Sequence, residues 1–502
     1  MESKGSASSI EAYIQQALVD WQIPGGAVSM INNGEIISSR GYGSTRVGSQ
    51  NSVNEETLFS IGSCSKAFTA AVLGLLVDEG VIKWDDKVVV YLPDICLSDP
   101  DITTEITIRD LLCHRSGLKR SIRLMNRDKV FDSDDYISRI AELEFDGAFR
   151  TRFGYNNSHY IVAGKIVETV TGKRWKEVVQ ERLFGPIGMT TSYTTYQDMI
   201  KSGTKNISSG HANLEGGFVP AELRVLDPVS SIEWTDYGEN PAGSIISNLK
   251  DMTRWLQCLL DGGEVNGQQI LSKKVLSDMI SPQMLVKPGE SEMDALFSVG
   301  LSTNILSYGL GWYVMDYRGH KMVFHPGQVH GFISAVAFLP ELKIGGVILL
   351  NTYQTMLHPM LGFYMFDKLL GYERDYSGEM KNLVAHWRVG AEMEIQDMLS
   401  SRPEKVSSSL TAQQVVGTYT SELYGDIQIS LENNRLFHRY GETSLFEADL
   451  EIWEDCTYLV NYHNKVNPQD YLTFIQDSDG EVNRLVVKDV DQFNRKSSTM
   501  EE

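Results

Sequence analysis

Apolar and polar positions near the start of the chain predict a helix followed by a hairpin. Residues Ser8 to Trp21 begin with the capping-box pattern Ser8-Ser9-Ile10-Glu11 and continue at helical spacing. Two apolar runs, Ala27 to Ile31 and Ile36 to Ser39, flank Asn33-Gly34. Because Asn-Gly favours the tight turn that joins paired strands, this segment predicts an antiparallel hairpin packed against the helix.

The middle of the chain has the spacing of helices, and strand patterns return after it. Helices are expected at Ser63 to Glu79, Thr107 to Cys113, Ser158 to Thr171 and Asn248 to Leu260. Strands are expected at Gly311 to Tyr317, Lys321 to His325, Phe332 to Leu339 and Ile344 to Leu350. The simplest packing joins the early hairpin and the late strands in one antiparallel sheet with helices around it, an α/β (α+β) architecture.

The pattern of apolar and polar residues changes after Tyr372. Glu379 to Ser400 has a helical pattern, and from Val415 short strand-like runs alternate with turns at regular intervals. Such spacing is typical of a small antiparallel barrel or sandwich. We therefore expect a catalytic domain over residues 8–375, a helical connector over 376–409 and a small all-β barrel domain over 410–495.

Charge and cysteine content narrow the function. The chain has 502 residues and a formal net charge of −21, which disfavours nucleic acid or an anionic membrane as a partner. Its five cysteines are scattered and form no CxxC pair, so neither a metal site nor a disulfide framework is expected. Met1 to Asp20 lacks the apolar core of a signal peptide. A soluble cytoplasmic enzyme is the expectation, and its oligomeric state is left open.

A candidate nucleophile and base stand together at the start of the most apolar predicted helix. Ser63-Cys64-Ser65-Lys66 has the form S-x-x-K, which places the hydroxyl and the amine on one helix face. A serine hydroxyl needs a neighbouring base, and a buried lysine with a lowered pKa can serve as one. Ser116 to Lys119 and Ser247 to Lys250 match the same pattern. Ser116 precedes a glycine turn and Ser247 precedes a helix cap, so neither is expected to be the nucleophile.

Two further segments add candidate chemistry. Tyr155-Asn156-Asn157 lies in a predicted loop, where the Tyr155 phenol near a lysine can exchange protons and the Asn157 amide can hold a substrate carbonyl. His325-Pro326-Gly327-Gln328 lies at a predicted strand end. Glycine allows close approach to the backbone, and the N–H groups of Gly327 and Gln328 are candidate oxyanion donors.

These segments together resemble the serine β-lactamase and penicillin-binding-protein-like family, in particular the class C β-lactamase-related esterases, peptidases and transacylases. Their order matches the family's S-x-x-K, Y-x-N and K-T-G or H-x-G boxes over roughly Ile10 to Leu370. Phe59 to Gly62, Leu112 to Leu118, Pro186 to Met189 and Pro241 to Gly243 match as well. The C-terminal part resembles the lipocalin-like barrel appended to some of these hydrolases.

The resemblance implies roles for the individual residues. Ser63 would be acylated, Lys66 and Tyr155 would move protons, and Asn157 would touch substrate. His325 would take the place of the third-box lysine, and the N–H groups of Ser63 and Gln328 would bind the oxyanion. His325 and Pro326 replace the lysine and threonine of many β-lactamases, so β-lactam hydrolysis is not expected.

The expected reaction is acyl transfer through a Ser63 acyl-enzyme, without a cofactor or metal, on an ester or amide of a small or peptide-like substrate. Water as the acceptor would make the protein an esterase, amidase or peptidase. A small-molecule hydroxyl or amine would make it a transacylase, and an internal amine a peptide cyclase. A catalytically inactive binding protein is the alternative from another class.

Overall fold

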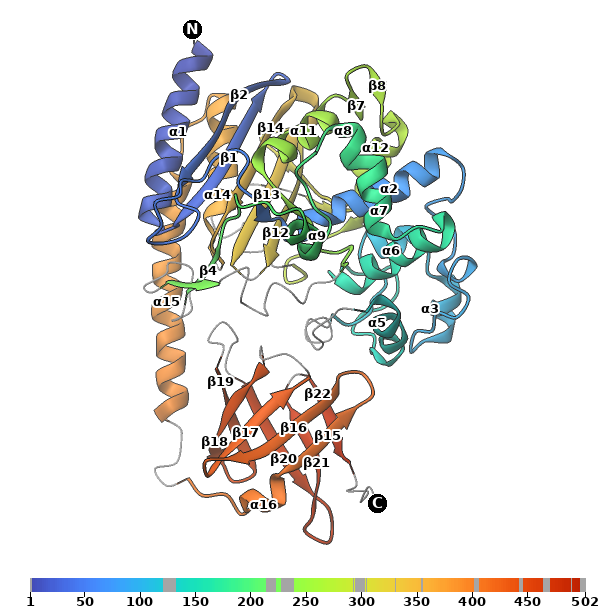
Figure 1. Ribbon diagram of the computed structural model, residues 1–502, viewed down its shortest axis with the longest axis vertical. Coiled ribbons are helices and arrows are strands. Elements are labelled where there is room, and N and C mark those ends of the chain that lie inside the picture. The colour runs from blue at the N-terminus through green and yellow to red at the C-terminus, as the bar shows by residue number, and fades with distance from the viewer. Residues whose placement is uncertain are drawn as a thin grey trace. The chain divides into compact units, whose positions relative to one another are not determined.

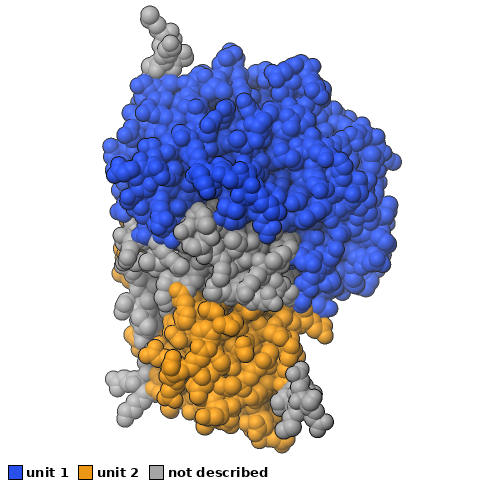
Figure 2. Space-filling model, viewed as in Figure 1, with its two compact units in different colours: residues 1–121, 132–384 blue, residues 122–131, 385–502 orange. Residues whose placement is uncertain are grey.

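The computed structural model describes residues 2–120, 132–213, 223–226, 239–291, 293, 303, 305–329, 331–353, 355–400, 406–441, 446–463, 470–488 and 490–496. Internal contacts divide the chain into two compact units, with the boundary between Val384 and Ala385 (Figures 1 and 2). Among the described residues, no helix is both long enough and apolar enough to cross a bilayer.

An antiparallel sheet of eight strands forms the centre of the first unit, and it joins the early hairpin to the late strands as the sequence predicted. Its order is β2-β1-β14-β13-β12-β11-β10-β9. The strands are β1 (Gly25–Asn32), β2 (Glu35–Gly43), β9 (Met284–Leu285), β10 (Leu306–Tyr308), β11 (Tyr313–Tyr317), β12 (His320–Val329), β13 (Phe332–Leu339) and β14 (Ile344–Leu350). The last two strands in the sheet order, β10 and β9, were not predicted. Asn33 and Gly34 both have positive φ, at 50° and 82°, so the predicted hairpin turn is present. The pairing of β1 with β14 joins the early hairpin to the late strands.

Helices cover both faces of this sheet (Figure 1). On one face lie α1 (Glu2–Asp20) and α14 (Leu357–Leu370), where the rings of Tyr13 and Tyr364 stack with centroids 3.5 Å apart. On the other lies α11 (Leu249–Leu260), against β1 and β14. Helix α1 begins before Ser8, so the predicted capping box does not start it. The helix continues past the predicted cap because its apolar side is buried from Ala7 to Leu18, and this packing stabilises the turn before Ser8.

The remaining helices of the first unit build the region beside the sheet. They are α2 (Ser65–Asp78), α3 (Pro100–Glu105), α4 (Ile108–Leu112), α5 (Ser133–Arg139), α6 (Asn157–Thr171), α7 (Trp175–Val179), α8 (Gly185–Ile187), α9 (Tyr196–Lys201) and α12 (Lys273–Met279). Short pairs of strands complete it: β3 (Phe59–Ser60) with β6 (Ile246–Ser247), β4 (Gly210–Asn213) with β5 (Leu223–Leu226), and β7 (Glu264–Val265) with β8 (Gln268–Gln269). Helix α15 (Tyr376–Ser400) follows the last sheet helix.

The second unit contains a closed antiparallel barrel, preceded by the short helix α16 (Ala412–Val415). Its strands are β15 (Gly417–Ser421), β16 (Gly425–Glu432), β17 (Arg435–Tyr440), β18 (Ala448–Glu454), β19 (Thr457–Tyr462), β20 (Asp470–Gln476), β21 (Val482–Val487) and β22 (Asp491–Arg495). Pairing of β15 with β22 closes the barrel. Its core is filled by buried side chains such as Tyr419, Leu472 and Phe474. The predicted small all-β domain is therefore a barrel rather than a sandwich.

Candidate active site

A short 3-10 turn places Ser63 directly before the buried helix α2. The turn spans Gly62–Cys64, and Lys66 is the second residue of α2. Gly62 has a φ of +49°, and a side chain there would come within 2.8 Å of the backbone nitrogen of Gln328. Only glycine relieves both constraints. The sharp turn therefore brings the Ser63 backbone beside strand β12.

Lys66 connects the serine to the helical side of the site. Its Nζ lies 2.9 Å from Ser63 Oγ and 2.9 Å from the carbonyl oxygen of Ala242. The side chain is fully buried, and Nζ lies 4.8 Å from the centroid of the Tyr155 ring. Burial, followed by the positive charge of Arg120, holds the pKa of the Lys66 amine well below its usual value. The amine can therefore be neutral, donating to Ala242 and accepting from the serine hydroxyl.

Strand β12 is pressed against the turn that carries Ser63. A side chain at Gly327 would lie within 1.9 Å of the carbonyl oxygen of Ile61, so that position requires glycine. The Cys64 thiol donates to the backbone carbonyl of His325 at 3.2 Å and lies 3.2 Å from Ser334 Oγ. These contacts bring the backbone of Gln328 close to the first turn at Ser63, where N–H groups have no acceptor within the helix.

Tyr155 and Asn157 lie on either side of the residue that caps helix α6. The N-cap is Asn156, whose Oδ1 accepts the Ser158 N–H at 2.9 Å. The helix therefore begins at Asn157, one residue before the predicted start at Ser158, because the Asn156 side chain accepts one of the free N–H groups of its first turn. Asn157 is the first residue of the helix rather than a loop residue. Its Oδ1 is buried and accepts no hydrogen bond from the described residues.

His325 is buried with both ring nitrogens occupied. Nδ1 lies 2.6 Å from the Pro326 carbonyl oxygen, which can only accept, so Nδ1 carries the proton. Nε2 then accepts from the Tyr308 hydroxyl at 2.8 Å. Burial, followed by the charge of Lys66, lowers the pKa of His325 to about 3. The imidazole is therefore neutral at physiological pH.

The strand that carries His325 is longer than the sequence predicted. Strand β12 continues through Pro326 to Val329 and stays paired with β13. The neighbouring strand β11 pairs only as far as Phe324. Proline is tolerated because, among the residues that the structure describes, no strand pairs with that edge of β12 beyond Phe324.

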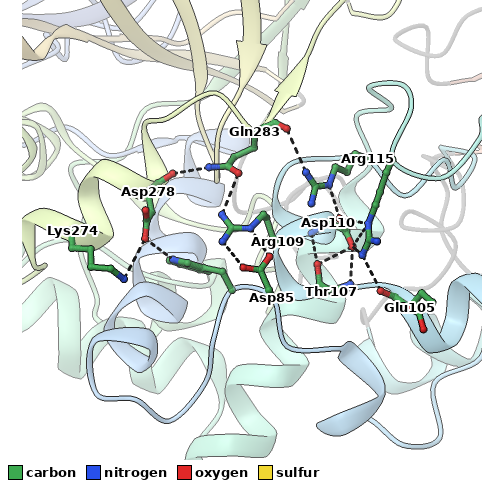
Figure 3. A network of polar contacts seen from close by, with 11 residues as sticks. Asp85, Glu105, Thr107, Arg109, Asp110, Arg115, Lys274, Asp278 and Gln283 are labelled. Carbon is green, nitrogen blue, oxygen red and sulfur yellow. Dashed lines mark hydrogen bonds and ion pairs between the residues drawn. The ribbon is translucent and has the colours of Figure 1, made fainter.

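A buried carboxylate holds the loop that leads to Tyr155. Asp110 accepts hydrogen bonds from Arg115 Nε at 2.5 Å and from the Thr107 hydroxyl and N–H (Figure 3). It also accepts a hydrogen bond from Arg150 Nη2 at 2.7 Å. Burial by itself would raise the pKa of Asp110, but the bonds from Arg150, Arg115 and Thr107 lower it below its usual value. Arg150 N also donates to the Arg115 carbonyl at 2.8 Å. The segment before Tyr155 is thus anchored on the segment after α4.

The same network reaches the edge of the sheet. Arg109 pairs with Asp85 and donates to Gln283 Oε1 at 3.1 Å, and Gln283 Nε2 donates to the Asp278 carbonyl (Figure 3). Gln283 N donates in turn to the Tyr308 carbonyl at 2.9 Å. Polar contacts therefore link the α4 region to the strand that carries the partner of His325.

The structure brings together Ser63, Lys66, Tyr155, His325, Gly327 and Gln328, and Asn157 lies two residues after Tyr155 along the chain. The other two S-x-x-K serines lie elsewhere. Ser116 Oγ contacts His159 Nε2, and Ser247 Oγ contacts Ser192 Oγ. Within the described ranges, no three His, Cys, Asp or Glu side chains are grouped to hold a metal ion.

Three contacts of the site were not predicted from the sequence: the Ala242 carbonyl at Lys66, the Tyr308 hydroxyl at His325, and the His114 ring at Tyr155. Ala242 and His114 both fall in phrases that resemble the family, Pro241 to Gly243 and Leu112 to Leu118. The phrases marked these positions but did not indicate what they contact. No sequence motif indicated a role for Tyr308.

Comparison with known proteins defines the class. A family model described as Beta-lactamase matches residues 10–368, and one described as a domain of unknown function (DUF3471) matches residues 401–501. The chain therefore belongs to the β-lactamase family, and its first unit has the fold of these serine hydrolases.

Individual relatives agree with this assignment. The chain is 26% identical over 449 residues to an unguisins hydrolase, ungD, of Aspergillus violaceofuscus, covering 84% of this chain and 76% of that protein. It is 30% identical over 378 residues to the unguisins hydrolase ungD' of Aspergillus campestris, covering 71% of this chain and 64% of that protein. The octameric penicillin-binding protein homologue from Pyrococcus abyssi superposes with a TM-score of 0.62 at 21% identity, covering 97% of this chain and 99% of that one.

Proposed function

We propose that this protein is a serine hydrolase that works through a Ser63 acyl-enzyme. It cleaves an amide or ester bond of a peptide-like substrate that has no charged group near that bond. The observation that carries the proposal is the contact of 2.9 Å between Lys66 Nζ and Ser63 Oγ. A buried amine with a lowered pKa at that distance is the base that a serine nucleophile needs.

In the acylation step, Ser63 Oγ attacks the substrate carbonyl carbon and its proton passes to the neutral Lys66 amine. The carbonyl oxygen becomes an oxyanion, which accepts from the N–H groups of Ser63 and Gln328. When the tetrahedral intermediate collapses, the bond to the leaving group breaks and the leaving group takes up a proton from Tyr155. Tyr155 regains a proton from Lys66, and Asn157 binds the substrate amide.

Deacylation repeats these steps with water. Water attacks the acyl carbon and gives up its proton to the Tyr155 and Lys66 pair. Ser63 Oγ leaves and is reprotonated, and the acid product departs. The names of the two fungal relatives, both hydrolases, favour water over another acceptor.

The third box favours substrates without a carboxylate near the scissile bond. His325 is buried and neutral, with both nitrogens engaged, so it supplies no fixed cation. Pro326 offers neither a hydroxyl nor an N–H. Neutral esters and amides should therefore acylate Ser63 faster than anionic β-lactams.

Substrate comparison tests this proposal. Rates of acyl-enzyme formation are measured by mass spectrometry for a neutral nitrophenyl ester, an N-acylated peptide amide and a cephalosporin. We expect the two neutral substrates to acylate Ser63 and release an acid. Faster acylation by the cephalosporin than by the neutral substrates would refute the assigned specificity.

The barrel of the second unit is proposed to be a separable domain that contributes no catalytic group, connected through a linker over residues 376–409. The proposed catalytic groups all lie between Ser63 and Gln328, well before Ala385. A chain shortened to end at Ser400 should fold and keep Ser63 reactive toward a small probe. Loss of labelling in a folded shortened chain would show that the barrel contributes to the chemistry.

A further inference from the structure

A buried chain of side chains runs from Ser116 to the loop of Tyr155. Ser116 Oγ lies 2.6 Å from His159 Nε2, and His159 Nδ1 lies 3.2 Å from His114 Nδ1. His114 Nδ1 in turn accepts the backbone N–H of Asn156 at 3.1 Å. Ser116, His159 and His114 are all at most 1% exposed.

The hydrogen bonds determine where the protons lie along this chain. Because the Asn156 N–H can only donate, His114 Nδ1 has no proton and acts as an acceptor. His159 then donates from Nδ1 and accepts the Ser116 hydroxyl proton at Nε2. Ser116 Oγ itself accepts the Leu118 N–H at 3.0 Å. Burial lowers the pKa of both imidazoles, that of His159 to about 3, so both rings are neutral.

His114 also packs against the proposed proton donor. Its ring centroid lies 4.5 Å from that of Tyr155 and 4.9 Å from that of Tyr308, the hydroxyl partner of His325. The backbone of His114 has a positive φ of 58°. A residue other than glycine is uncommon in that region, yet the contacts of the His114 ring and of Nδ1 hold it there.

We propose that His114, fixed in one tautomer by His159 and Ser116, is a positioning residue that sets the place of Tyr155 and Asn157 in the active site. Asn156, whose N–H it holds, is the residue between these two. Ser116, the serine of the second S-x-x-K sequence, is thus not a nucleophile. It orients His159, which in turn orients His114. This inference rests on the proposed roles of Ser63, Lys66 and Tyr155.

Two variants of His114 distinguish the effect of its Nδ1 acceptor from the effect of its ring packing. His114→Asn keeps an acceptor atom at the place of Nδ1 and tolerates a positive φ. His114→Phe keeps a ring but leaves the buried Asn156 N–H without an acceptor. We expect His114→Phe to lower kcat on the neutral ester by about tenfold to a hundredfold with KM changed by less than about threefold, since small displacements of catalytic groups have effects of that size. His114→Asn should retain clearly more kcat.

A milder pair of variants covers the case in which His114→Phe does not fold. Ser116→Ala removes the hydroxyl that fixes the His159 tautomer. Ser247→Ala is the matched control, because Ser247 is also fully buried and also begins an S-x-x-K sequence. Ser116→Ala should lower kcat and speed hydrogen exchange of the Asn156 amide, whereas Ser247→Ala should change neither. Identical behaviour of these two variants, or equal kcat in a folded His114→Phe and His114→Asn, would overturn the proposal. Labelling of the wild-type Ser63 by a fluorophosphonate reports separately on the proposed function.

Discussion

Lys66 Nζ lies 2.9 Å from Ser63 Oγ, while the same nitrogen makes a second contact of 2.9 Å with the Ala242 carbonyl oxygen. A carbonyl oxygen accepts only, so one N–H of the amine is directed away from the serine. In the neutral amine the lone pair is then available to the serine hydroxyl. The Ala242 segment thereby orients the proposed base.

Replacing Lys66 by arginine should abolish acylation. The guanidinium keeps the positive charge but does not give up its proton, so it cannot accept the Ser63 proton. We expect Lys66→Arg to reduce the rate of Ser63 labelling by on the order of a thousandfold or more. Lys250→Arg, at the exposed lysine of the third S-x-x-K sequence, should label at the wild-type rate. A labelled Lys66→Arg protein would move the role of base to Tyr155.

Tyr155→Phe should slow substrates according to their leaving groups. If the phenol protonates the leaving group, kcat for an alkyl amide should fall by at least about a hundredfold. A nitrophenyl ester, whose leaving group departs without a proton, should be affected much less. Steady-state kinetics on both substrates test this expectation. Equal losses on the two substrates would contradict the role of the phenol as proton donor to the leaving group, because they would place its action before that step.

The pH dependence of acylation should follow Lys66 and not His325. The pKa of the amine is lowered but the reaction needs its neutral form, so the rate should rise with pH as Lys66 loses its proton. The pKa of His325 is about 3, so it should add no step near pH 6.5. Pre-steady-state acylation of the neutral ester across roughly pH 5.5 to 8 brackets the ordinary pKa of histidine. A step near pH 6.5 that disappears in His325→Gln would contradict the neutral imidazole.

Removing the Asp110 carboxylate should destabilise the fold. Asp110 is fully buried, but Arg115 and Arg150 are 19% and 42% exposed, so water can solvate them once the carboxylate is gone. Asp110→Asn should therefore lower the free energy of unfolding by roughly 2 kcal/mol, the size of lost hydrogen bonds to a charged group. Asp85→Asn, in the same network but with a side chain 69% exposed, should cost less than about 1 kcal/mol. Denaturant titrations at pH 7 provide both values.

The sign of the pH effect at Asp110 follows from its lowered pKa. Its contribution to stability is fully present above the unfolded carboxyl pKa of about 3.9 and is lost as the pH falls through the lower folded value. Asp110→Asn should therefore flatten the loss of stability on acidification. An unchanged acid dependence in this variant would show that the carboxylate is not held by the two arginines.

Much of this architecture is predictable from the sequence because it depends on local patterns. The hairpin at Asn33-Gly34 follows from turn chemistry, and the contact of Ser63 with Lys66 follows from a spacing of three residues. The helix was expected to begin at Ser63, but a 3-10 turn carries Ser63 and α2 begins at Ser65. Six of the eight strands of the sheet follow from strand patterns at the two ends of the first unit, whereas the short strands β9 and β10 do not. The boxes that resemble the family indicated which side chains would meet.

The parts that were not predicted depend on contacts between distant segments. Ala242 reaches Lys66 across 176 positions of the chain, and no periodic pattern encodes such a contact. Strand β12 passes through Pro326 because β11 ends at its pairing with Phe324, which only the sheet reveals. Burial and the charge of Lys66 keep His325 neutral, and the Tyr308 hydroxyl contacts its Nε2 from another strand. The third box alone indicates neither.

The central claim is that Ser63 becomes acylated, and labelling followed by peptide mass analysis tests it most directly. The wild-type protein, Ser63→Ala and Ser247→Ala are each treated with a fluorophosphonate and with a slowly hydrolysed neutral ester. The account predicts one adduct in the wild type and in Ser247→Ala, located on the peptide that contains Ser63, and no adduct in Ser63→Ala, whose turnover falls by about a thousandfold or more. Labelling of folded Ser63→Ala, or an adduct on Ser116 or Ser247 in the wild type, would contradict the account.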